Sequence, residues 1–282
     1  MTFLQGAALF IAAILAGALN SVAGGGSFIS FPTLLFTGVP SIAANATNTV
    51  ALWPGSLASI PPYRKDFAHE RRELVIFSIV SVIGGVLGAI ILLRTPQPLF
   101  QRMIPWLLLI ATLIFAFGNN AAQWLRSLRE RVQPDDVADP AMSETGEQRE
   151  KSEAGSLTRI TPGALVVVLL IQFVIALYGG FFGGGIGIMM LAGFALLGMR
   201  DIHAMNALKV VLASVINGVA IVAFAIAGAI YWPQALLMVV GSVIGGYGGA
   251  ALAHRVPPRY VRWFAIAVGL IISAYFFIKQ GL

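Results

Sequence analysis

Residues 81–94 read SVIGGVLGAIILLR, and residues 242–255 of the same chain read SVIGGYGGAALAHR. Eight of these fourteen positions are identical when the chain is shifted by 161 residues, which is more than shared hydrophobicity produces. The sequence therefore predicts a duplicated unit, with one copy in each half of the chain. The same shift pairs further residues of the two copies: Gly24 with Gly185, Gly26 with Gly187, Asn45 with Asn206, and Asn48 with Lys209.

The composition of the 282 residues excludes an ordinary soluble protein. Hydrophobic residues make up 58% of the chain and charged residues 11%, whereas soluble domains carry about 25% charged residues. The chain has no cysteine, which excludes a disulfide scaffold, thiol catalysis and cysteine-held metal sites. The net charge of +6 comes from Lys and Arg in short stretches between apolar runs, a pattern typical of a multispan membrane protein and not of nucleic-acid binding.

The apolar runs predict transmembrane helices, because about 20 such residues cross the roughly 30 Å hydrocarbon core of a bilayer. Shorter apolar runs at 27–37 and 187–197 follow glycine clusters, and the first contains Pro32. We expect an all-α polytopic membrane protein in which each repeat has about four full transmembrane helices and one short broken or re-entrant helix. The predicted spans are 4–22, 42–60, 74–93 and 103–117 in the first half, and 164–182, 204–224, 233–253 and 263–278 in the second.

A polar segment separates the two halves. Residues 119–160 hold six Lys or Arg and eight Asp or Glu, which predicts a solvated linker between a first repeat at 1–118 and a second at 161–282. Residues 121–132 are expected to form a short amphipathic helix at the membrane surface, and residues 133–156 to be disordered.

The placement of the charges favours two repeats of inverted topology. If the short helix crosses the membrane, each repeat has five crossings, and the odd number turns the second repeat upside down. This topology puts 14 loop cations inside and three outside, whereas four crossings per repeat put 11 inside and six outside. The positive-inside rule therefore predicts inverted repeats, with both termini periplasmic and the linker cytoplasmic.

The two glycine clusters are candidate binding elements. Gly24, Gly25, Gly26 and Ser27 precede the first short helix, and Gly183, Gly184, Gly185 and Gly187 accompany the second. Inverted repeats with an interrupted helix in each half are typical of secondary transporters, whose site lies near the midplane. The glycines expose amide N–H groups that attract anions, or they serve only the close packing of helices.

Polar residues on the helices after the breaks are the other candidates. Asn45 and Asn48 share one helical face, and Thr47 lies between them. Lys209 follows Asp201 by eight residues, or about 12 Å along a helix, which is deep for a lysine in the membrane. Either Lys209 reaches back to the interface, or it lines a cavity and neutralises an anionic substrate. Ser30, Thr33, Ser56, Ser214 and Asn217 are secondary candidates.

Other classes of function find less support in the sequence. The predicted spans hold no nucleophile–base pair, metal cluster or paired carboxylates, so we expect neither an enzyme nor a cofactor. No Asp or Glu lies within a span as a partner for Lys209, which argues against a cation transporter built on carboxylates. A non-transporting scaffold that binds partners through the linker, and a transporter of another small anion, remain alternatives.

The glycine-rich motifs resemble those of the TauE/SafE sulfite-exporter family, over both halves and without the linker. The resemblance implies a bacterial inner-membrane permease that exports sulfite, sulfoacetate or related organosulfonates. We also expect a small anionic substrate and membrane lipid as partners, with a coupling proton or sodium ion and a second copy of the chain as further candidates. The matching residues are 17–27 (GALNSVAGGGS), Pro32, Gly38, 44–48 (ANATN), 206–209 (NALK) and 245–255. The expected substrate-binding residues are Asn20, Gly24, Gly25, Gly26, Ser27, Asn45, Thr47, Asn48, Gly184, Gly185, Asn206 and Lys209.

Overall fold

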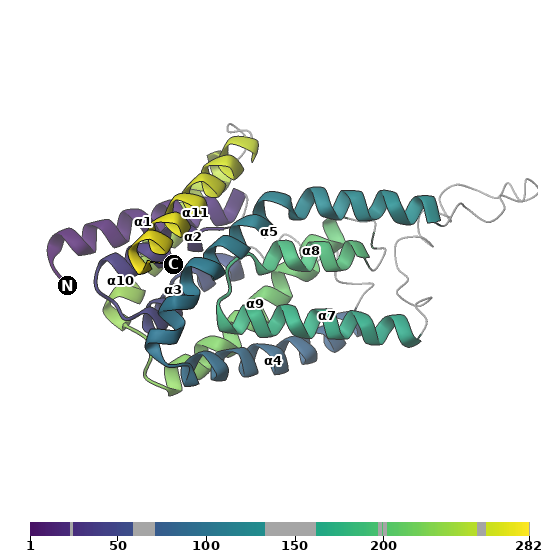
Figure 1. Cartoon of the computed structure of the whole chain (residues 1–282), viewed down its shortest axis with the longest axis horizontal. Helices are drawn as coiled ribbons and strands as arrows, with labels where there is room; N and C mark the ends of the chain where they lie inside the picture. The colour runs from purple at the N-terminus through teal and green to yellow at the C-terminus, as the bar shows by residue number, and fades with distance from the viewer. Residues whose placement is uncertain are drawn as a thin grey trace, which may run out of the picture.

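The computed structural model describes residues 1–22, 25–58, 71–132, 162–196, 199, 202–252 and 258–281, and all regular structure within them is helical (Figure 1). The all-α prediction is therefore confirmed for these residues. The first half contains α1 (Phe3–Val22), α2 (Ser27–Phe36), α3 (Ser41–Ala58), α4 (Arg71–Arg94) and α5 (Gln97–Val132). The second half contains α7 (Pro162–Phe181), α8 (Ile186–Leu196), α9 (Ile202–Ile226), α10 (Trp232–Leu252) and α11 (Pro258–Gln280).

Five of the described helices are long and apolar enough to cross a membrane. Their outer faces carry large apolar side chains, such as Ile11 and Leu15 on α1 and Val75 and Ile79 on α4, with 45–57% of each exposed. In water such faces would be polar, whereas in a bilayer lipid tails cover them. The five spans are Phe3–Asn20, Leu74–Arg94, Gln97–Phe117, Met205–Ile226 and Trp263–Gln280.

The two short interrupted segments expected from the sequence are short helices. α2 has 10 residues and α8 has 11, which at 1.5 Å per residue is about half the thickness of the hydrocarbon core. Each follows glycines with positive φ: Gly25 has φ +88°, and Gly183 and Gly185 have φ +79°. Only glycine adopts this conformation without strain, so these residues set the turns that begin the short helices.

Glycines of the duplicated stretch let helices approach each other at backbone distance. A Cβ built on Gly245 of α10 would lie 1.9 Å from the carbonyl oxygen of Ile14 on α1. A Cβ built on Gly88 of α4 would lie 2.1 Å from the carbonyl oxygen of Leu177 on α7. No side chain larger than hydrogen fits at either position, so the repeated glycines mark two close helix pairs, α1 with α10 and α4 with α7.

Each close pair joins a helix of the first half to a helix of the second. A shift of 161 residues converts α1 into α7 and α4 into α10, so it converts one pair into the other. Figure 1 shows α1, α2, α10 and α11 together on the left and α4, α7 and α8 on the right. The helices of one sequence half are therefore distributed over both sides of the bundle.

The helix α5 is longer than expected. It continues without interruption to Val132, so residues 121–132 extend α5 and do not form the separate surface helix that the sequence suggested. At 1.5 Å per residue its 36 residues span about 54 Å, more than the bilayer core. α5 contains Pro98 in its first turn and Pro105 further along, and the next proline, Pro134, follows its end. The helix therefore ends close to the first residue that cannot continue it. The expected disordered stretch 133–156 lies outside the described residues.

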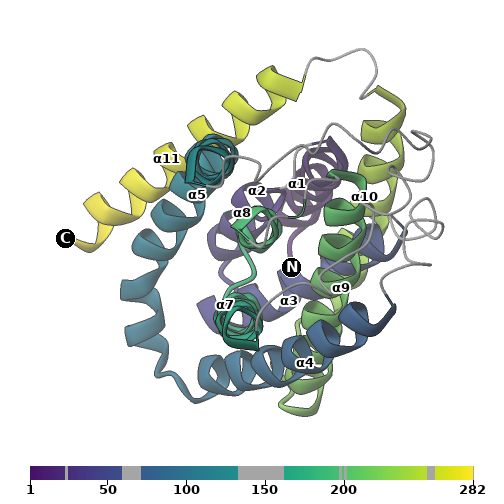
Figure 2. The same ribbon diagram turned by 90° about the vertical axis from the view of Figure 1, so that its right-hand side faces the viewer.

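The two chain termini lie on the left of Figure 1, and α5 ends on the opposite side. Seen from that side, α5, α7 and α8 point toward the viewer, and α8 lies inside the bundle (Figure 2). It contacts α5, α7 and α9. The second short helix is therefore enclosed by longer helices.

Candidate functional site

The first glycine break is closed by a side chain of the preceding helix. The amide N–H of Gly26 donates to Oδ1 of Asn20 on α1 at 2.9 Å. A Cβ built on Gly26 would lie 2.3 Å from the carbonyl oxygen of Ala16, so the chain turns back tightly against α1. Asn20 thus acts as a cap for the break, and Gly24 lies outside the described residues.

Asn48 on α3 holds the start of α2 with both ends of its amide. Its Oδ1 accepts a hydrogen bond from the Ser30 hydroxyl at 2.5 Å, and its Nδ2 donates to Oγ of Ser27 at 3.2 Å. Ser30 is fully buried and Asn48 is 4% exposed. The structure therefore brings Asn48 to the first break, together with Ser30, which the sequence suggested only as a secondary candidate.

Asn45, one turn earlier on α3, contacts the second break instead. Its Nδ2 donates to the carbonyl oxygen of Phe181, the last residue of α7, at 3.1 Å. Thr47 is fully buried and accepts a hydrogen bond from the amide N–H of Tyr231 at 3.0 Å, so it ties α3 to the turn before α10. The shared face of Asn45 and Asn48 thus links both glycine breaks.

The two breaks also meet on one turn of α5. A Cβ built on Gly25 would lie 3.3 Å from the ring of Phe115, and one built on Gly184 would lie 3.6 Å from Cβ of Ala111. Ala111 and Phe115 are four residues apart, which is about one helical turn. No polar pattern on α5 marks these residues, and the sequence alone did not identify them.

The second break lacks the side-chain cap that Asn20 provides at the first. Under the 161-residue shift the counterpart of the capping Asn20 is Phe181, which has no hydrogen-bonding side chain. The amide N–H groups of residues 184–187 have no acceptor among the residues that the structure describes. They form the start of α8, where the backbone carries a partial positive charge.

Lys209 lies against this open break. Its Cδ is 3.3 Å from the position of a Cβ built on Gly187, and its Nζ donates to Oδ1 of Asn206 at 2.9 Å. Four cationic side chains are described, and only Lys209 among them is not exposed. The other three are Arg94, Arg102 and Lys279.

The remaining polar candidates have mainly local partners. Thr33 donates to the carbonyl oxygen of Ile29 at 2.7 Å, and Ser56 to that of Leu52 at 3.5 Å, both within their own helices. The Asn217 carboxamide oxygen lies 3.8 Å from a Cβ built on Gly183, so Asn217 belongs to the surroundings of the second break.

A tryptophan that was not among the candidates joins the two central helices. Trp53 of α3 donates through Nε1 to the carbonyl oxygen of Ser214 on α9 at 2.9 Å. Trp53 and Ser214 are exactly one repeat shift of 161 residues apart, so equivalent positions of the two copies touch each other.

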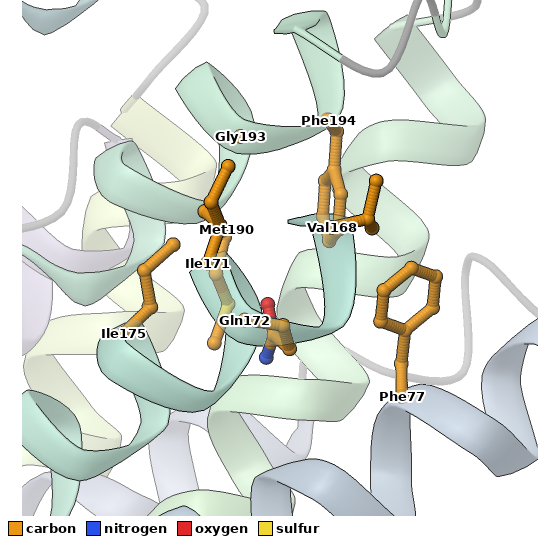
Figure 3. Close-up of a pocket in the computed structure, with 8 residues that line it drawn as sticks. All are labelled: Phe77, Val168, Ile171, Gln172, Ile175, Met190, Gly193 and Phe194. Carbon is orange, nitrogen blue, oxygen red and sulfur yellow. The ribbon is translucent and has the colours of Figure 1, made fainter. Parts of the chain in front are cut away.

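A small cavity lies between α4, α7 and α8 and is not suited to an anion (Figure 3). Its one polar side chain is Gln172, whose Nε2 donates to Oγ of Ser81 at 2.8 Å. No cationic residue is among the described residues that line it. Its remaining lining residues are Phe77, Val168, Ile171, Ile175, Met190, Gly193 and Phe194.

Comparison with known proteins gives the family. The model of the family described as "Sulfite exporter TauE/SafE" matches residues 9–276. No solved structure gives a significant match.

Relatives of similar length carry transporter names. A probable membrane transporter protein, ORF9, of Sinorhizobium sp is 26% identical over 94% of this chain and 89% of its own length. A probable membrane transporter protein of Haemophilus influenzae is 26% identical over 98% and 95%, and YfcA of Escherichia coli K12 is 24% identical over 94% and 87%. The chain belongs to the TauE/SafE sulfite exporter family and is a multi-pass membrane transporter.

Proposed function

We propose that this protein is a secondary transporter that exports small sulfur-containing anions, such as sulfite or organosulfonates, across the bacterial inner membrane. Substrate binds where the two glycine breaks meet, and the site is exposed to one side of the membrane at a time. The proposed contacts are Asn20, Gly24, Gly25, Gly26, Ser27, Asn45, Thr47, Asn48, Gly184, Gly185, Asn206 and Lys209.

The observation that carries this proposal is the position of Lys209. Its ammonium has a neutral partner, Asn206, and the side chain lies against the uncapped break before α8. The sequence from residue 202 to 282 contains no acidic residue. A cation held in a membrane protein next to free amide N–H groups favours an anionic ligand.

The helix packing supports two copies related by a two-fold axis, and the placement of the loop cations favours an inverted arrangement of these copies. The exchange of helix partners under the 161-residue shift, and the contact of Trp53 with its own counterpart Ser214, are what a two-fold axis between the copies produces. The termini and the end of α5 lie on opposite sides, which fits periplasmic termini and a cytoplasmic linker.

Energy for export comes from a gradient. An inside-negative membrane potential contributes about 2.3 kcal/mol per charge per 100 mV toward the exit of an anion. A proton or a sodium ion would supply the coupling where that potential is not sufficient.

The test is sulfite flux into proteoliposomes. We expect Lys209→Ala to abolish the flux and Lys209→Arg to retain part of it, because arginine keeps the charge. Lys279→Ala is the matched control, since this exposed lysine at the end of α11 is far in sequence from both breaks. Flux that is unchanged in Lys209→Ala would reassign Lys209 to the interface and refute the site.

A non-transporting scaffold is the alternative that the linker suggests. Deleting residues 133–156 separates the two functions, because a transporter keeps its flux without this segment and a scaffold loses its partners. Loss of flux in the deletion variant, with normal insertion into the membrane, would contradict a transport mechanism confined to the two repeats.

A further inference from the structure

We propose that the transported anion carries a single negative charge and binds at the second glycine break, against Lys209. This inference rests on the proposed function and narrows its substrate class. It comes from the charge of the site and from the difference between the two breaks.

The site has one formal charge. Residues 1–63, 74–93, 103–125, 160–199 and 263–278 contain no Asp, Glu, Lys or Arg at all. Lys209 is the only charged residue between Asp201 and Arg255. Every other charge of the chain lies outside these apolar runs. Among the side chains that the structure describes, Lys209 carries the one charge at the second break.

One ammonium neutralises one negative charge. The environment of the site has a low dielectric constant, where an unpaired charge is costly and a paired charge is tolerated. A monoanion beside Lys209 forms a neutral pair, whereas a dianion leaves one charge uncompensated. The amide N–H groups at the start of α8 add the equivalent of about half a positive charge, which orients an oxyanion and does not balance a second full charge.

The first break does not supply the missing charge. Where the second copy has Lys209, the first has Asn48, and both ends of the Asn48 amide are occupied by serines of α2. The Gly26 amide N–H is occupied by Asn20. The described side chains at the first break are therefore neutral and bond one another, and this break adds no second positive charge to the site.

This charge balance divides the sulfur oxyanions into two groups. Bisulfite and simple sulfonates carry one negative charge and match Lys209. Sulfate, fully deprotonated sulfite and sulfoacetate carry two, and the site rejects them. We therefore infer that sulfite crosses as bisulfite, and that its flux falls as rising pH converts bisulfite into the dianion.

Methanesulfonate and sulfate provide the test, because both present a tetrahedral sulfur with oxygen ligands and differ in charge. The full chain is reconstituted in proteoliposomes, and each anion is measured both as a transported species and as an inhibitor of sulfite flux. We expect methanesulfonate to be recognised at least tenfold better than sulfate. Equal recognition, or a preference for sulfate, overturns the inference and leaves the proposed function standing. Failure to recognise either anion, in the absence of sulfite flux, overturns both.

A second lysine should change the preference. Asn48→Lys places a lysine at the position that corresponds to Lys209, and we expect it to improve recognition of sulfate relative to methanesulfonate by at least tenfold. Gln101→Lys adds the same charge at an exposed position and serves as the control. An unchanged ratio in a folded Asn48→Lys protein contradicts the inference, and the wild-type comparison decides it if that variant does not fold.

Discussion

Replacing Gly245 by alanine should weaken the packing of α10 on α1. The new Cβ would lie 1.9 Å from the carbonyl oxygen of Ile14 and 2.6 Å from its carbonyl carbon. Both are backbone atoms, so no side chain can rotate to make room, and the helices must separate by about 1 Å in an interior that is close-packed. Overpacking of this kind costs about 1–3 kcal/mol.

Gly248 on the same helix is the matched control. A Cβ built there meets nothing within 4 Å, so Gly248→Ala keeps the contacts and gains up to about 1 kcal/mol of helix propensity. Gly245→Ala gains the same propensity, so the two variants should still differ by the packing cost of about 1–3 kcal/mol. Thermal unfolding of the two variants in the same detergent should differ by several degrees, with Gly245→Ala the less stable. Equal stability would refute the backbone contact between α1 and α10.

Two hydrogen bonds, one between α3 and the turn before α10 and one at the first break, lead to further predictions. Thr47→Val removes the acceptor for the Tyr231 amide and should lower the unfolding free energy by about 1–3 kcal/mol. The Thr49 hydroxyl bonds only its own helix, so Thr49→Val should change the unfolding free energy little. A smaller loss for Thr47→Val than for Thr49→Val in thermal unfolding would contradict the contact. Asn20→Ala removes the acceptor for the Gly26 amide, and it should reduce both thermal stability and sulfite flux while protein insertion stays close to normal. Asn20→Asp keeps the acceptor oxygen and should restore the thermal stability. Equal flux in wild type and Asn20→Ala would show that the cap has no part in transport.

The positions of the helices followed from the sequence because apolar length and glycine clusters are strong signals in a membrane. The short helices α2 and α8 begin one residue or less from the expected starts at Ser27 and Gly187, since positive-φ glycines fix where a helix can begin. The predicted end of the helix at residue 117 was wrong, because α5 continues to Val132. Charged residues favour leaving the membrane, yet they do not end a helix, and no proline stops α5 before Val132.

The substrate-binding role of the candidate residues stays a prediction, whereas their hydrogen-bond partners are visible in the structure. Asn45 and Asn48 lie on one face as expected, but the sequence could not show that one reaches the second break and the other the first. The difference arises from the tertiary arrangement of α2 and α7 around α3. Trp53 was missed because an aromatic residue in an apolar helix gives no sign of a backbone partner 161 residues away.

The pairing of α1 with α10 has a consequence for biogenesis. During synthesis α1 enters the membrane about 200 residues before the glycine-rich face of α10 has been made. Until then the backbone surface around Ile14 lacks its partner helix α10. The helix α4 likewise lacks its partner α7 until that helix is made, although for a shorter time. The first half of the chain therefore cannot reach its final packing alone. Separately made halves should be unstable apart and should assemble when they are produced in the same cell.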